Sequence, residues 1–200
     1  DRSGGRPRLL HACSWRTQKK HGRQRDQHRG REHPTQVDAR GCVLRDTGGP
    51  SPEIAKRLAQ ELAVRGNVDI LAGFGLTPEA LAVADVATQA KKPMVIFNAA
   101  TSIITTRSPY IVRTSMTLPQ VSAPLGTWAA RNGIKRVVTL VADYGPGSDA
   151  EAAFRKTFTA GGGAVVESLR TPLQNPDFGP FVQRVKDAKP DAVFIFVPSG

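Results

Sequence analysis

Three short loops contain the residues of this chain whose types could bind a small molecule. They cover residues 73–77, 98–101 and 142–147, and each combines small residues with a hydroxyl group directly after a short apolar run. If those runs are parallel strands, the loops lie at strand carboxyl ends, where the next helix offers free backbone amides and the positive end of its dipole. This pattern favours non-covalent binding of a solute.

Covalent catalysis is disfavoured by the residue types that are missing. No His or Cys follows Cys42, and the pattern Gly-x-Ser-x-Gly does not occur. Ser-His-Asp and Cys-His sites need those side chains, so we expect no catalytic residues and no enzyme activity. The His and Cys residues before that point show neither C-x-x-C nor H-x-x-x-H spacing, so no metal site and no cofactor are predicted.

Two other ligand chemistries fit the loops less well. The pattern Gly73-x-Gly75-x-x-Pro78 approaches a dinucleotide fingerprint, but proline replaces the third glycine and no acid follows near the end of the next strand. Asp143 at a predicted strand end could be a phosphoacceptor, but no paired acids accompany it to bind a metal.

The elements that position these loops alternate between apolar runs and amphipathic segments from Val43 onward. Ser51-Pro52-Glu53 and Thr77-Pro78-Glu79 have the residues of helix starts. A helix is also predicted from Pro119 to Asn132, with Val121, Leu125, Trp128 and Ala129 facing the interior. Strands are expected over residues 68–72, 94–97, 110–114, 136–141, 164–169 and 191–197. This alternation predicts an α/β fold with mainly parallel sheets.

Residues 1–42 differ in composition from the rest of the chain. They hold 11 of the 28 Lys and Arg residues against 4 acids, a local charge of +7, whereas the remaining residues carry +4. Their apolar residues are few and show no helical or strand period. We therefore expect a disordered basic segment that contains no strand and packs against nothing.

The basic segment admits two further interpretations. It could be an Arg-rich tail that binds nucleic acid, which salt-dependent DNA binding lost on its deletion would reveal. Its Arg-, Gly-, His- and Gln-rich composition is also typical of out-of-frame translation of a GC-rich gene, a hypothesis that the upstream DNA read in another frame would test. The printed sequence shows no apolar run of membrane-spanning length and no signal peptide.

Residues from about 43 to 200 resemble a known family. The stretches VLRDTGGPSPEIAKRLAQELAVRGNVDILAGFG, KKPMVIFNAATSIIT, YIVRTS and GIKRVVTLVADYGPGSDAEAAFRKTFTAGGGAVVES are similar to type I periplasmic solute-binding proteins of ABC transporters, in the leucine/isoleucine/valine-binding branch. The resemblance implies a two-lobed α/β fold, each lobe a doubly wound, mainly parallel sheet, here incomplete. It places a first lobe lacking its first strand at 43–115 and a truncated second lobe at 116–200.

The same resemblance implies a function and a site. It predicts capture of a branched-chain amino acid or a similar small carboxylate solute in the periplasm, for delivery to an ABC permease, with no cofactor and no nucleic acid. Thr77 would offer a hydroxyl at a helix N-terminus, Ala99 its backbone, Thr101 its amide and hydroxyl, and Tyr144 an aromatic ring from the second lobe. Two alternatives stay open: Thr77 is a plain helix N-cap, or the fold serves as a ligand-sensing regulatory domain.

Overall fold

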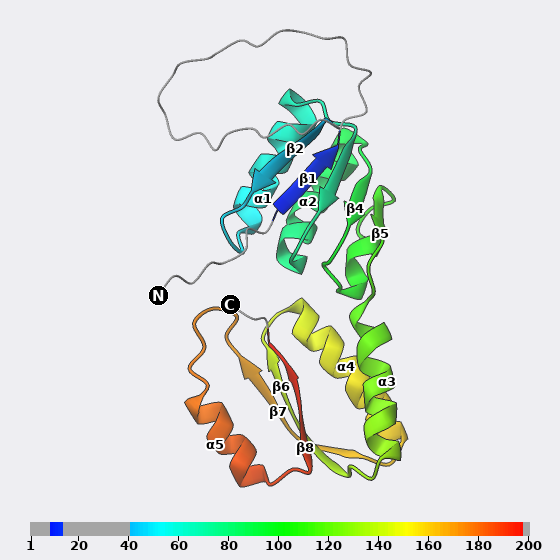
Figure 1. Ribbon diagram of the computed structural model, residues 1–200, viewed down its shortest axis with the longest axis vertical. Helices are drawn as coiled ribbons and strands as arrows, with labels where there is room; N and C mark the ends of the chain where they lie inside the picture. The colour runs from blue at the N-terminus through cyan, green and yellow to red at the C-terminus, as the bar shows by residue number, and fades with distance from the viewer. Residues whose placement is uncertain (1–8, 14–40, 198–200) are drawn as a thin grey trace. The chain divides into compact units, whose positions relative to one another are not determined.

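The computed structural model describes residues 9–13 and 41–197 (Figure 1). The chain divides into two compact units. The amino-terminal unit comprises the described residues up to Ala99 together with Thr105–Thr114, and the carboxy-terminal unit comprises Ala100–Ile104 together with the described residues from Ser115 onward. Each unit contains one β-sheet.

The amino-terminal unit is built on a five-stranded sheet. The strands in spatial order are β2 (Cys42–Asp46), β1 (Leu9–Cys13), β3 (Ile70–Gly73), β4 (Met94–Ile96) and β5 (Ile111–Arg113). The β3–β4 and β4–β5 pairs are parallel, as the alternation of strands and helices predicts. This parallel half of the sheet leads into the loops that were predicted to bind ligand.

Two helices that pack against each other belong to this unit, α1 (Pro52–Gln60) and α2 (Thr77–Ala90). The predicted start of α1 is confirmed, since the Ser51 hydroxyl accepts a hydrogen bond from the amide of Ile54 at 3.4 Å and Pro52 is the first helical residue. A π-helical turn, η1 (Glu61–Arg65), extends α1. The short 3-10 helix η2 (Ser102–Thr106) contains residues of both units.

The prediction that residues 1–42 contain no strand is wrong at Leu9–Cys13. That the first lobe lacks the first strand of the family stays a prediction. β1 runs antiparallel to β2, with Leu9 opposite Asp46, and antiparallel to β3, with His11 opposite Ala72. A strand between β2 and β3 pairs backbone groups of both, a benefit that needs no amphipathic pattern. Residues 1–8 and 14–40 lie outside the described residues, so the other interpretations of the basic segment stay predictions.

The carboxy-terminal unit contains a parallel sheet between two layers of helices. The strand order is β7 (Ala164–Thr171), β6 (Arg136–Ala142), β8 (Ala192–Phe196), and β6 is parallel to both neighbours. The helices α3 (Leu118–Arg131) and α4 (Gly145–Ala160) lie on one side of the sheet, and α5 (Gly179–Ala188) lies on the other (Figure 1).

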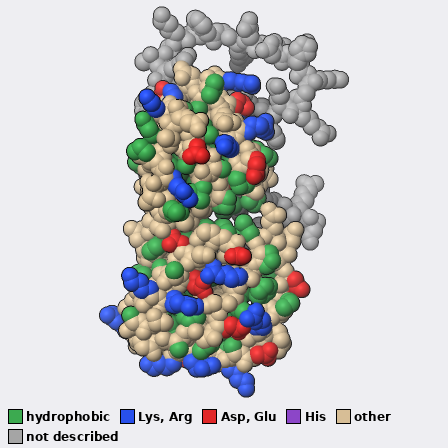
Figure 2. Space-filling view, turned by 180° about the vertical axis from the view of Figure 1, so that it is seen from behind, with side chains coloured by type: hydrophobic (Ala, Val, Ile, Leu, Met, Phe, Trp, Pro, Cys, Tyr) green, Lys and Arg blue, Asp and Glu red, His purple; other side chains and the backbone are tan. Residues whose placement is uncertain are grey.

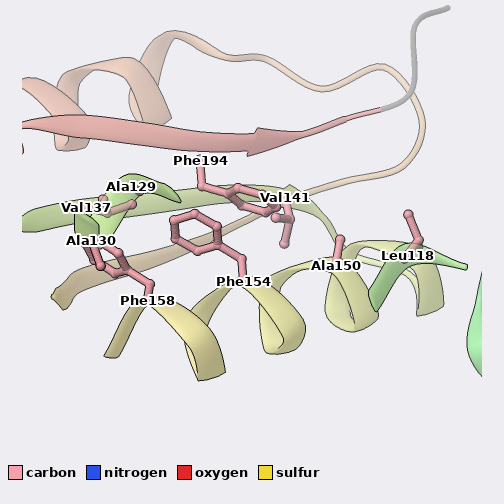
Figure 3. Close-up of a cluster of buried hydrophobic side chains, with 9 residues drawn as sticks. All are labelled: Leu118, Ala129, Ala130, Val137, Val141, Ala150, Phe154, Phe158 and Phe194. Atoms are coloured by element: carbon pink, nitrogen blue, oxygen red, sulfur yellow. The ribbon is translucent and has the colours of Figure 1, made fainter. Parts of the chain in front are cut away.

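Aromatic side chains dominate the core between α4 and the sheet (Figure 3). The ring of Phe154 stacks on Phe158 and Phe194, with centroid distances of 5.3 Å and 4.4 Å. This cluster comprises Leu118, Ala129, Ala130, Val137, Val141, Ala150, Phe154, Phe158 and Phe194. A second cluster under α5 contains Val138, Leu140 and Leu169.

The predicted orientation of α3 is wrong for its large residues. Val121, Leu125 and Trp128 are exposed, whereas the face that packs on α4 consists of small residues such as Gly126 and Ala129. A Cβ atom at Gly126 would lie 2.4 Å from the carbonyl oxygen of Phe154, so the two helices touch through their backbones. Small residues permit this close contact, and the large residues are left exposed beside it.

Charged side chains of both signs are scattered over the face drawn in Figure 2. Lys and Arg side chains stand next to Asp and Glu side chains on the drawn face of both units (Figure 2).

Within the part of the chain that the structure describes, no helix is both long enough and apolar enough to span a bilayer. No group of three or more His, Cys, Asp or Glu residues in that part is arranged to hold a metal ion.

Candidate functional site

Hydrogen bonds join the loops that follow β3 and β4. The amide of Phe97 donates to the Gly73 carbonyl at 2.8 Å, and the Asn98 side-chain amide donates to the Gly75 carbonyl at 2.9 Å. Phe74 is almost fully buried and has a left-handed backbone with a φ of 67°, a conformation that non-glycine residues rarely adopt. The carboxyl edge of this sheet is therefore an ordered surface.

Thr77 is the first residue of α2, and its side chain is buried. The N-cap position belongs to Leu76, so the interpretation of Thr77 as a plain N-cap is wrong. Proline follows Thr77 in the first turn, and Glu79, also buried, accepts a hydrogen bond from the Thr47 hydroxyl at 3.2 Å. Thr77 therefore places a hydroxyl at the positive end of the α2 dipole.

Ala99 lies beside the start of this loop. Its amide donates to the Phe74 carbonyl at 3.0 Å, and its side chain is buried. Because the Ala99 amide already donates this hydrogen bond, the backbone group of Ala99 that is left for a ligand is its carbonyl oxygen, which accepts. Thr77 and Ala99 thus belong to two cross-linked loops at the carboxyl ends of adjacent parallel strands.

Thr101 belongs to the carboxy-terminal unit, although Ala99, two residues earlier, belongs to the other. The carbonyl of Ala100 accepts a hydrogen bond from the Leu118 amide at 3.0 Å, at the start of α3. Ser102 donates from its amide and its hydroxyl to the carboxylate of Asp149, in α4. Thr101 itself is 5% exposed and is held between these two anchored neighbours.

Tyr144 occupies the N-cap position of α4, two residues after the end of β6, and is half-buried. Its amide donates to the Ala142 carbonyl at 2.9 Å. A Cβ atom at Gly147 would lie 2.0 Å from the same carbonyl oxygen, so the first turn of α4 is pressed against the end of β6. Only glycine permits this approach.

The four predicted residues fall into two pairs. Thr77 and Ala99 lie together at the carboxyl edge of the amino-terminal sheet, and Thr101 and Tyr144 lie near the beginning of α4 in the carboxy-terminal unit. Thr77 follows β3, Ala99 and Thr101 follow β4, and Tyr144 follows β6, so all four residues come after the carboxyl ends of parallel strands.

Sequence reasoning missed three polar residues that shape these edges. Asn98 and Asp149 hold the loops, and Thr171, at the end of β7, has a buried hydroxyl without a hydrogen-bond partner among the described residues. Asn98 was recognised only as part of an exit loop. The role of Asp149 depends on a residue 47 positions away, so no local signal in the sequence identifies it.

Comparisons with known proteins found similar sequences and similar solved structures. Residues 42–200 match a family model described as "Periplasmic binding protein". The Leu/Ile/Val-binding protein homolog 6 of Brucella abortus is 50% identical over 171 residues, which cover 84% of this chain and 44% of that protein.

Two solved structures from Rhodopseudomonas palustris are also similar. A solute-binding protein of an ABC transporter from strain BisB5, in complex with 3,4-dihydroxybenzoic acid, is 63% identical, with a TM-score of 0.73 over 75% of this chain and 41% of that one. Another, in complex with 4-hydroxybenzoate, is 53% identical, with a TM-score of 0.76 over 78% of this chain and 42% of its own.

These similarities confirm the α/β fold with parallel sheets and the family resemblance that the sequence indicated. The chain spans less than half the length of the relatives that it matches. Because the family model matches residues 42–200 and a relative is 50% identical, the chain belongs to the periplasmic binding protein family.

Proposed function

We propose that the chain supplies the solute-binding loops of a periplasmic component of an ABC transporter, which captures a small carboxylate and delivers it to a membrane permease without chemical change. The observation that supports this proposal is the placement of two buried threonines, Thr77 and Thr101, after the adjacent parallel strands β3 and β4. Loops at the carboxyl ends of parallel strands are the usual ligand-binding positions of such sheets.

The solute class that we favour is a hydroxylated benzoate. The two Rhodopseudomonas palustris relatives, 63% and 53% identical to this chain, were solved with 3,4-dihydroxybenzoic acid and 4-hydroxybenzoate. The competing class is a branched-chain amino acid, which the name of the Brucella relative suggests. An amino acid carries an ammonium group that needs an acceptor, whereas a benzoate needs donors for its carboxylate and an apolar surface for its ring.

Each predicted residue has a role in this proposal. The hydroxyls of Thr77 and Thr101 donate to the carboxylate, and the N-terminus of α2 contributes the favourable end of its dipole. The carbonyl of Ala99 accepts a hydrogen bond from a phenolic hydroxyl, since its amide is already paired. The ring of Tyr144 covers the aromatic ring of the solute.

The experiment is a thermal melting panel on a chimeric protein, in which residues 42–200 of this chain replace the matched part of the strain BisB5 relative. A ligand that binds only the folded state raises the melting temperature in proportion to ln(1 + [L]/Kd). We expect 4-hydroxybenzoate and 3,4-dihydroxybenzoate to raise it, and 4-hydroxybenzamide, which lacks the charge, to leave it unchanged. A shift with leucine but not with benzoates would transfer the assignment to amino acids.

A further inference from the structure

The sequence contains two cysteines, Cys13 and Cys42, and the pairing of two strands places them opposite each other. β1 ends at Cys13, β2 begins at Cys42, and the two strands lie side by side (Figure 1). In their antiparallel register, Cys13 is the direct partner of Cys42. Residues 14–41 separate the cysteines along the chain, whereas the sheet brings their Cα atoms together.

The direction of the backbone groups in β3 shows which kind of antiparallel pair the two cysteines form. The Leu71 amide donates to the Pro93 carbonyl at 2.9 Å, so the backbone groups of Leu71 are directed towards β4. Because this direction alternates along a strand, the backbone groups of Ala72 point towards β1. His11 lies opposite Ala72 and therefore directs its own backbone groups towards β3. Cys13, two residues further along β1, has the same direction and turns its backbone groups away from β2.

Cys13 and Cys42 are therefore a non-hydrogen-bonded pair of the β1–β2 ladder. The Cα atoms of such a pair are about 4.5 Å apart, whereas those of a hydrogen-bonded pair are about 5.5 Å apart. Disulfides join residues whose Cα atoms are about 4.4–6.8 Å apart. The register of the two strands thus meets the backbone requirement for a disulfide.

We propose that Cys13 and Cys42 form an intramolecular disulfide when the chain meets a thiol–disulfide exchange oxidant. The thiolate of one cysteine attacks a sulfur atom of the oxidant's disulfide and forms a mixed disulfide, and the thiolate of the other cysteine then displaces the oxidant as a thiol. The two cysteines lose two electrons and two protons in total, and the oxidant's disulfide is reduced to two thiols. Oxidants of this kind act in the bacterial periplasm, and the chemistry does not depend on the identity of the solute.

The disulfide holds β1 in the sheet that leads to the candidate site. β1 pairs with β2 on one side and with β3 on the other. β3 ends at Gly73, where the loop that leads to Thr77 begins. A cross-link between distant residues restricts the unfolded chain, so oxidation stabilises the amino-terminal unit. It thereby keeps the strand that borders β3 in place.

The test compares oxidation of the full 200-residue chain in the folded state and in urea, with oxidised glutathione as the oxidant. After remaining thiols are blocked, trypsin without reductant releases the cysteine-containing peptides 9–16 and 41–45. We expect the folded chain to lose both thiols and to yield these peptides as one linked species. The equilibrium constant for closure should be at least about tenfold larger in the folded chain than in urea, because folding has already brought the two positions together. Oxidation should raise the urea midpoint of the parent chain and leave that of Cys13→Ser unchanged.

The matched control combines Cys42→Ser with Val43→Cys, which moves the thiol by one residue along β2. Position 43 lies opposite Ala12, and successive residues of a strand face opposite sides of the sheet. We expect this double variant to close like the parent in urea and not to close in the folded state.

Four results would overturn the proposal. These are glutathione adducts on the two cysteines without a linked peptide, disulfides between copies of the chain in place of the internal link, closure as favourable in urea as in the folded chain, or closure of the folded double variant as complete as that of the parent. If the double variant does not fold, the comparison of the parent chain with and without urea decides.

Discussion

Ser102 donates two hydrogen bonds to Asp149, from its amide to Oδ2 at 2.9 Å and from its hydroxyl to Oδ1 at 3.1 Å. This bidentate contact ties the loop after β4 to the second turn of α4. It fixes the backbone directly after Thr101, which we propose contacts the solute. When a binding residue is positioned by the contacts of its neighbour, removal of those contacts lowers the affinity of the protein for its solute.

The change Asp149→Ala should release this loop. We expect the free energy of unfolding to fall by about 1 kcal/mol, because two hydrogen bonds near the surface are lost. The amide of Ser102 should exchange its hydrogen faster in the variant. The control is Asp187→Ala, which removes an exposed hydrogen bond to Gln183 and should leave the exchange at Ser102 unchanged. Unaltered exchange in Asp149→Ala would contradict the anchoring role.

Glu151 is the buried carboxylate of the carboxy-terminal unit. The hydroxyl of Thr139 and the guanidinium of Arg170 both donate to it. Glu151→Ala leaves these donors without their acceptor, and we expect the free energy of unfolding to fall by about 2–3 kcal/mol in urea titrations. Glu167→Ala breaks the more exposed pair with Arg184 and should cost at most about 1 kcal/mol. An equal loss of unfolding free energy in the two variants would show that the burial of Glu151 does not strengthen its contribution to stability.

The pKa of Asp191 lies below its ordinary value of 3.8, because the amides of Lys135 and Arg136 donate to its carboxylate. The unfolded chain therefore takes up this proton at higher pH than the folded chain. The stabilisation is complete above the unfolded value and is lost as pH falls through the folded value. Relative to Asp191→Asn, the parent chain should be more stable at pH 6, and the difference should shrink below pH 3.8. A difference that stays constant across this range would refute the assignment.

Gly126 allows α3 and α4 to touch. An added Cβ would meet the Phe154 carbonyl oxygen at 2.4 Å and the Thr157 hydroxyl at 2.3 Å. We expect Gly126→Ala to lower the free energy of unfolding by about 1–3 kcal/mol through overpacking. Adding Thr157→Ala to this variant should restore little of the lost stability, since the carbonyl oxygen of Phe154 still clashes with the added Cβ. Full rescue by the second change would show that the side chain alone caused the clash.

The order of elements could be predicted because it depends on local features. Proline and a capping serine identify the start of α1, and apolar runs identify β3, β4 and β6. The position of Thr77 at the start of α2 follows from the same kind of signal. These features are encoded within a few residues of where they act.

Features that depend on distant partners could not be predicted. The pairing of β1 depends on the adjacent edges of β2 and β3, which local composition does not reveal. The orientation of α3 was predicted wrongly because both of its faces are apolar, and the choice between them depends on how closely α4 approaches Gly126. The Ser102–Asp149 contact joins residues 47 positions apart.

Calorimetric titration of 4-hydroxybenzoate into the chimeric protein measures solute capture by these loops most directly. We expect saturable 1:1 binding that Thr101→Val weakens about tenfold, since one hydrogen bond to a charged group is lost. Thr105→Val, in the 3-10 helix η2 that follows Thr101, should bind like the parent. A folded chimeric protein that binds no benzoate, or binds it equally well with Val at position 101, would contradict the capture of a benzoate through Thr101.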